Sequence, residues 1–134
     1  MEEAAVNRSS VSVTRLSAHT GAEVAGLDVS GPVDEETRVR LNQAFLDHAV
    51  IAIRDQGLNA PQFLEAMKIF GEIFPQHNPR FAIPECPQIH YISNQEKLED
   101  GRVYIPGEGY HTDHSNDIEP PKASDRTVIN RRWD

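Results

Sequence analysis

The apolar run from Ala49 to Ile53 constrains the fold of this chain more than any other segment. Three of its five side chains are β-branched, and the polar stretch from Arg54 to Gly57 follows directly. A short, continuous apolar run that ends in a polar turn is typical of a strand covered on both faces. We therefore predict a buried strand at 49–53, in the centre of a sheet.

Helix signals lie on both sides of this strand. Asp34 can cap a helix, acidic residues follow it, and apolar side chains recur at helical spacing, which predicts a helix at about 35–48. Asn59 as cap and Pro61 in the first turn open a second helix, for which Gly71 is available as the end. The strand should therefore be preceded and followed by helices.

The remaining segments predict short strands and a long loop. Residues 74–87 contain four prolines, which favours an ordered surface loop over any regular element. Short apolar or alternating pieces elsewhere predict strands, with the last of them a strand or an extended segment. These pieces are 11–13, 22–24, 27–29, 89–93 and 103–105. Helices and strands in this order predict an α+β fold in a single domain.

Composition excludes several classes of function. The net charge of −8 would repel a phosphate backbone, so we expect no nucleic-acid partner. The sequence has no apolar run of about 18 residues and no basic start before an apolar stretch, so neither a membrane span nor a secretory signal is expected. The single cysteine, Cys86, fits a reducing compartment, and we expect a cytoplasmic protein.

His111 and Asp113 form the strongest candidate site. On an extended segment, residues two positions apart project to the same face, so both side chains could bind one ion. An imidazole and a carboxylate are two of the three ligands in the facial triad that holds Fe(II). Two glycines shortly before the pair allow tight turns. A His-x-Asp tripeptide alone is a weak signal, and a solvated loop remains the alternative.

Four segments together are more specific than the tripeptide. Gly21 to Val29, Ile53 to Gln56, Phe70 to Glu72 and Tyr110 to Asp113 resemble, in order and spacing, the N-terminal part of the TauD/TfdA family of Fe(II)- and 2-oxoglutarate-dependent dioxygenases. The resemblance implies a partial double-stranded β-helix, or jelly roll, with two flanking helices. It also implies Fe(II) as cofactor, 2-oxoglutarate and O₂ as cosubstrates, and oxidation of a small anionic substrate with release of succinate and CO₂.

The resemblance also implies roles for individual residues. It makes His111 and Asp113 the first two iron ligands, and it places His77, Tyr110 and Asn116 on the substrate side. His114 follows the second ligand directly, and on a strand it would face away from the metal. We therefore expect His114 to support the site from outside it, or to point outward.

The family also needs a distal His and an Arg that binds 2-oxoglutarate, both far downstream of His-x-Asp. The sequence departs from the family pattern after Ala123, so we expect a flexible N-terminus at 1–10, the N-terminal part of the dioxygenase domain at 11–123 and a divergent tail at 124–134. The C-terminal half of the fold would then be absent. Arg126 could be the remnant of the cosubstrate Arg after an internal deletion; a frameshift or a mis-spliced end explains the tail equally well.

These expectations leave two functional hypotheses. The first is a truncated or fragmentary dioxygenase that lacks the distal ligand and the cosubstrate Arg, and that binds iron weakly. The second is a catalytically inactive α/β protein that associates with a partner, or with its own copy, through an exposed sheet edge.

Overall fold

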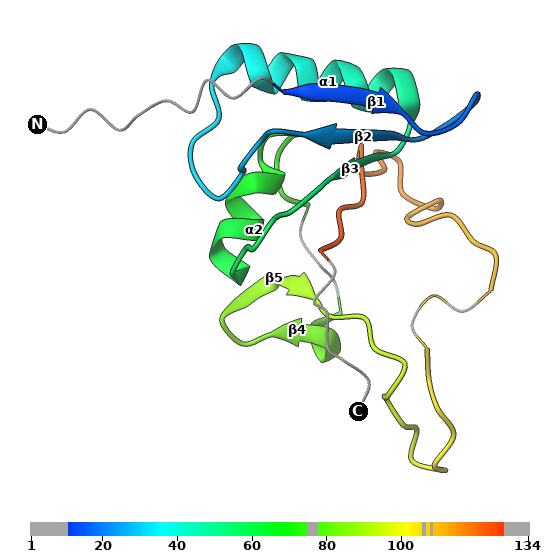
Figure 1. Ribbon diagram of the computed structural model, residues 1–134. Coiled ribbons are helices and arrows are strands. Elements are labelled where there is room, and N and C mark those ends of the chain that lie inside the picture. The colour runs from blue at the N-terminus through cyan, green and yellow to red at the C-terminus, as the bar shows by residue number, and fades with distance from the viewer. Residues whose placement is uncertain (1–10, 75–77, 106, 108, 128–134) are drawn as a thin grey trace, which may run out of the picture. The chain divides into compact units, whose positions relative to one another are not determined.

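The computed structural model describes residues 11–74, 78–105, 107 and 109–127. The chain divides into two compact units, Met1–Glu72 and Ile73–Asp134. The first carries β1 (Ser12–Arg15), β2 (Ala22–Ala25), α1 (Glu35–His48), β3 (Ile51–Ile53) and α2 (Ala60–Met67), as Figure 1 shows. The second carries η1 (Pro79–Phe81), β4 (Ala82–Ile83) and β5 (Cys86–His90). The α+β class is confirmed.

The sheet of the first unit has the order β1-β2-β3. β2 runs antiparallel to β1 and parallel to β3, with Val24 opposite both Val13 and Ile53. Ala22 and Val24 are fully buried, whereas the alternate residue Glu23 forms an ion pair with Arg54 at 2.8 Å. This alternation is that of a strand with one face on the core.

The predicted central position of the apolar run is therefore wrong. Within the described residues β3 pairs with β2 alone, and its three side chains are half-buried. A continuous apolar run indicates that neither face of a strand is fully exposed, but it does not indicate whether the strand pairs with one strand or with two. β2 occupies the centre because the β1–β2 turn and the crossover through α1 place a strand on each side of it.

Residues 27–29 do not form the predicted strand, although Leu27 and Val29 are buried. The side chain of Gln56 satisfies their backbone instead. Its Oε1 accepts a hydrogen bond from the Val29 N–H at 2.9 Å, and its Nε2 donates to the Leu27 carbonyl at 2.7 Å. One amide thus replaces the ladder that a neighbouring strand would supply.

The helices begin at the predicted caps. The Asp34 carboxylate accepts from the Thr37 N–H at 2.8 Å, and Asn59 forms a reciprocal capping box with Gln62. Figure 1 shows α1 running alongside the sheet. Both helices contribute to one core, whose buried members are Val11, Val24, Leu27, Val29, Leu41, Ala66 and Phe70. In the described residues no helix is long and apolar enough to span a membrane.

Within residues 78–87, the second unit forms regular elements where we predicted an ordered surface loop. Pro79 starts the 3₁₀ turn η1, where a missing N–H costs nothing, and the antiparallel pair β4–β5 follows, with Ala82 opposite His90. β5 begins at Cys86, three residues before the strand predicted at 89–93. The segment 103–105 takes part only in an isolated bridge, from Val103 to Lys97.

Candidate metal centre

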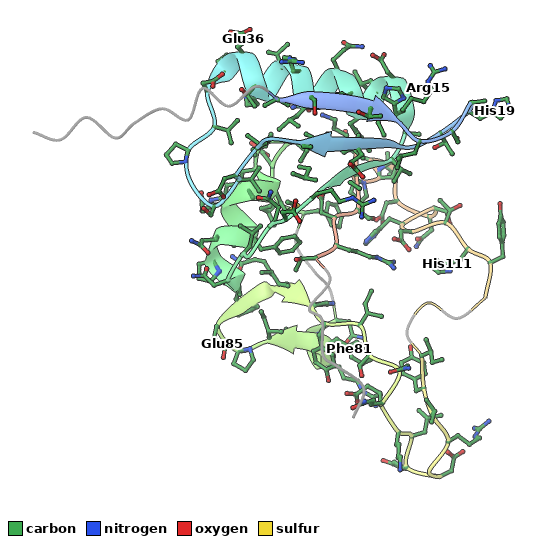
Figure 2. The ribbon with its side chains drawn as sticks, in the orientation of Figure 1. Arg15, His19, Glu36, Phe81, Glu85 and His111 are labelled. Atoms are coloured by element: carbon green, nitrogen blue, oxygen red, sulfur yellow. The ribbon has the colours of Figure 1, made fainter. Side chains whose placement is uncertain are left out.

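The structure brings the side chains of His111 and Asp113 together. His111 Nε2 lies 3.1 Å from Asp113 Oδ1, and both side chains are about half-exposed, at 46% and 47%. The pair lies on a loop rather than a strand, within the segment where Figure 2 labels His111. Turns in this loop bring the two side chains together, whereas we expected the alternation of side chains along a strand to do so.

The separation of the two donor atoms fits a shared metal ion. In an octahedral shell with metal–ligand bonds of about 2.1 Å, two adjacent donors lie about 3.0 Å apart. The observed distance is 3.1 Å. An imidazole nitrogen and a carboxylate oxygen are also donors that Fe(II) accepts in proteins. The distance between these two atoms is therefore compatible with adjacent positions around one ion.

The hydrogen bonding of His111 prepares Nε2 for a cation. Its Nδ1 lies 2.9 Å from the Gly109 carbonyl oxygen, which can only accept, so Nδ1 carries a proton and donates. In the neutral imidazole, Nε2 then presents a lone pair toward Asp113 Oδ1. Two acceptors at this distance need a proton or a cation between them. A backbone carbonyl on the far nitrogen is a common support for metal-binding histidines.

Gly107 packs against the ring of His111. Its φ is +77°, which favours glycine, and a Cβ added there would lie 3.2 Å from His111 Cε1 and 3.5 Å from Nε2. Gly109 also has positive φ, at +95°. The two glycines that precede the pair thus have distinct tasks: one leaves room for the imidazole, and the other turns its carbonyl toward Nδ1.

Asp113 is supported by a residue that sequence reasoning missed. The Ser124 hydroxyl donates to Asp113 Oδ2 at 3.2 Å, which leaves Oδ1 for the side facing His111. We assigned Ser124 to the divergent tail, and a serine eleven positions away from the carboxylate gives no local signal of this contact.

His114 lies next to the pair but binds another carboxylate. Its Nδ1 is 2.8 Å from Asp117 Oδ2, and its ring meets Phe74 edge-on, with 5.0 Å between centroids. Its φ of +52° lies in the left-handed region, which is uncommon for a residue with a Cβ. This arrangement uses one ring nitrogen for an ion pair or hydrogen bond within the loop.

The other predicted site residues are not joined to the pair by any described contact. Tyr110 and Asn116 flank it along the chain with exposed side chains, and Arg126 is exposed as well. His77 lies outside the described residues. In the described part of the chain, no third His, Cys, Asp or Glu completes a metal-binding group.

Comparison with known proteins agrees with the sequence resemblance. Residues 12–125 match the model of the family described as taurine catabolism dioxygenase TauD, TfdA family. A taurine dioxygenase from Burkholderia xenovorans is 30% identical and has a TM-score of 0.66; the match covers 84% of this chain and 38% of that one. A second protein of that organism, assigned to the alpha-ketoglutarate-dependent taurine dioxygenases, is 29% identical with a TM-score of 0.68, over 84% and 39% of the two chains.

The chain thus spans about two fifths of the length of these solved relatives. Its α+β arrangement corresponds to part of their fold. The family match extends over most of the chain and includes the loop that carries His111 and Asp113. The chain belongs to the taurine catabolism dioxygenase TauD, TfdA family.

Proposed function

We propose that His111 and Asp113 are two of the protein ligands of an Fe(II) centre in a 2-oxoglutarate-dependent dioxygenase. The observation that carries this proposal is the 3.1 Å separation of His111 Nε2 and Asp113 Oδ1, which suits two adjacent ligands of one ion. When bound, the iron and its cosubstrate supply oxidation of a small anionic substrate by O₂, with release of succinate and CO₂. Membership of the family supports the same reading.

The chain's own residues orient the two ligands. The Gly109 carbonyl holds the Nδ1 proton of His111, which keeps the lone pair on Nε2 and fixes the plane of the ring. The Ser124 hydroxyl holds Oδ2 of Asp113 and so limits rotation of the carboxylate about its own axis. Both supports come from within the second unit, so the pair keeps its geometry through local contacts.

Two protein ligands leave most of an octahedral shell to other donors. We propose that a further ligand, and a cation for the distal carboxylate of 2-oxoglutarate, complete the centre in the whole enzyme. The exposed guanidinium of Arg126 is the candidate for the second task within this chain. Because no third His, Cys, Asp or Glu joins the pair among the described residues, we propose that the 134-residue chain binds metal weakly and produces no succinate.

The substrate side of the proposal rests on sequence neighbours of the pair. His77, Tyr110 and Asn116 would contact an anionic substrate, the imidazole by charge and the other two by hydrogen bonds. Both described members of this group have exposed side chains and can be reached from solvent. We also propose a cytoplasmic location, because the single cysteine, Cys86, can form no internal disulfide.

Metal binding tests the ligand assignment. Mn(II) can replace Fe(II) under air, and its free-ion EPR signal falls when it binds. We expect His111→Ala and Asp113→Asn each to abolish the weak binding of the unmodified chain, because the first removes one of two donor atoms and the second removes the negative charge of the carboxylate. His19→Ala, which removes an exposed imidazole from the first unit, is the matched control and should leave binding unchanged. Unchanged binding in His111→Ala would refute the assignment.

Succinate production tests completeness separately. The 134-residue chain is incubated with Fe(II), 2-oxoglutarate and O₂, and succinate is measured by chromatography. We expect none above a no-protein control. Turnover by this chain would show that it holds a complete centre, and the proposal of an external ligand would then be wrong even though the ligand pair could stand.

A second candidate function has one structural observation in its favour. β3 offers an unpaired edge within the described residues, and Val50 beside it is 61% exposed. A strand edge of this kind can pair with a partner or with a second copy. Analytical ultracentrifugation distinguishes this reading: a concentration-dependent dimer that persists in His111→Ala would favour association as the role of the chain, and a monomer at all concentrations would exclude self-association.

A further inference from the structure

A cluster of aromatic rings occupies the second unit, apart in sequence from the candidate metal centre. Phe81 is buried, and Figure 2 labels it beside the β4–β5 pair. Tyr91 meets its ring edge-on with 5.9 Å between centroids, and Tyr104 lies nearly parallel to it, at 6.0 Å and 20°. The three rings therefore join η1, the residue after β5 and the segment near 104 into one apolar platform.

The guanidinium of Arg80 lies over this platform. Its Cζ is 5.4 Å from the centroid of Phe81 and 5.9 Å from that of Tyr104, both within the range of a cation–π interaction. Among the described residues it is the only arginine placed over aromatic rings. The backbone is fixed as well, because the Asn78 side chain accepts from the Arg80 N–H at 3.0 Å.

No carboxylate of the described residues forms an ion pair with Arg80. Three other arginines do have such partners: Arg38 pairs with Glu35, Arg54 with Glu23 and Arg102 with Asp100. The acidic residue of the ring cluster, Glu96, instead accepts a hydrogen bond from the Tyr91 hydroxyl at 2.9 Å. That bond raises the pKa of Tyr91, and the positive charge of Arg80 partly opposes the rise.

This combination prepares Arg80 for an anion. A cation–π contact does not use the N–H hydrogen-bond donors of a guanidinium, and no described carboxylate takes them in Arg80. Those donors match the two oxygens of a carboxylate in a bidentate pair. Contact with two rings also restricts a side chain that would otherwise lose considerable rotamer entropy on binding.

We propose that Arg80, held on Phe81 and Tyr104, binds the carboxylate of a small organic acid. The ring of Tyr104 is half-buried, so part of it remains available to a flat acid that stacks beside the guanidinium. The site uses no metal ligand. It therefore stands or falls independently of the assignment of His111 and Asp113.

Benzoate is a suitable probe because it joins a planar carboxylate to a ring, and benzamide is its uncharged counterpart. Nitrogen-edited NMR of the 134-residue chain resolves arginine Nε–Hε groups, and the shift of the Arg80 signal during titration gives the dissociation constant. We expect a saturable shift with benzoate and less than a tenth of that affinity with benzamide. Equal shifts with both probes would overturn the proposal, because binding would then need no charge.

Variants separate the guanidinium from general charge effects. The Arg80→Gln variant lacks the Nε–Hε signal, so its binding is followed at backbone amides of the β4–β5 pair. Its affinity for benzoate should be at least tenfold lower than that of the unmodified chain. Arg102→Gln removes an exposed, ion-paired arginine from the same unit and should change the affinity less than twofold. Equal losses in these two variants would refute a specific site.

Two further variants guard against an effect on folding. Tyr104→Leu keeps an apolar side chain but removes one ring, and we expect a several-fold loss with the backbone spectrum otherwise preserved. Arg80→Lys keeps the charge without the planar fork and should bind less tightly than the unmodified chain. If lysine restored full affinity, a simple positive charge would explain binding and the proposed bidentate site would be excluded.

Discussion

Replacing Gly107 by alanine should weaken metal binding through the ring of His111. The new Cβ would lie 3.2 Å from Cε1 and 3.5 Å from Nε2, whereas carbon atoms in contact prefer about 3.5–4.0 Å. The ring must therefore move by a few tenths of an ångström, against the hydrogen bond that Nδ1 donates to the Gly109 carbonyl. Such outer contacts are typically worth about 10–100-fold in metal affinity, and we expect a loss near the lower limit.

The substitution also carries a backbone cost that must be separated from this effect. Alanine at a φ of +77° is destabilised by about 1–2 kcal/mol relative to glycine. Gly101→Ala is the matched control, because φ there is +82° and no atom lies within 4 Å of the added Cβ. Both variants should lose similar stability in urea, whereas only Gly107→Ala should lose Mn(II) affinity in the EPR titration. Equal losses of affinity, or none in Gly107→Ala, would refute the role assigned to Gly107.

Three other predictions concern the first unit. Leu41→Ala removes a side chain with no exposed surface and should lower the free energy of unfolding by about 2–5 kcal/mol, while Leu46→Ala, at a residue 69% exposed, should change it by less than about 0.5 kcal/mol; urea titration checks both. Gln56→Glu keeps an acceptor but loses two N–H donors, so unfolding should become about 1–3 kcal/mol easier by the same assay. The Thr37 N–H lowers the pKa of Asp34, so its stabilising effect should be present above the unfolded pKa near 3.8 and should fade as pH falls through the lower folded value; Asp34→Asn should flatten this acid dependence in thermal melts.

Local chemistry explains which parts of the fold could be predicted. α1 begins after Asp34 and ends at His48, as the sequence indicates, because a cap is a contact between residues three positions apart. Strand order depends on distant partners, and the apolar run at 49–53 did not reveal that β3 has one neighbour. The prolines after residue 74 suggested a loop, yet Pro79 fits the first position of a 3₁₀ turn.

In the candidate site, too, local features could be predicted and contacts between distant residues could not. His111 and Asp113 lie close together, but on a loop rather than on the extended segment from which their convergence was predicted, and the preceding glycines have the positive φ that tight turns need. The contact from Ser124 to Asp113 could not be predicted, because the two residues are eleven positions apart and the contact depends on the path of the chain between them. The metal role itself remains a prediction that the binding experiments test.

The side chain of Gln56 has a consequence for how the first unit tolerates insertions and deletions. One amide anchors residues 27–29 at two backbone groups, so this segment is not paired residue by residue with a neighbouring strand. A change of length between Gly31 and Asp34 should therefore leave both hydrogen bonds intact. A one-residue insertion in β2 would instead exchange the positions of Glu23 and Val24 and place a carboxylate in the core. Length variation among natural or designed versions of this unit should therefore concentrate after Val29 and avoid β2.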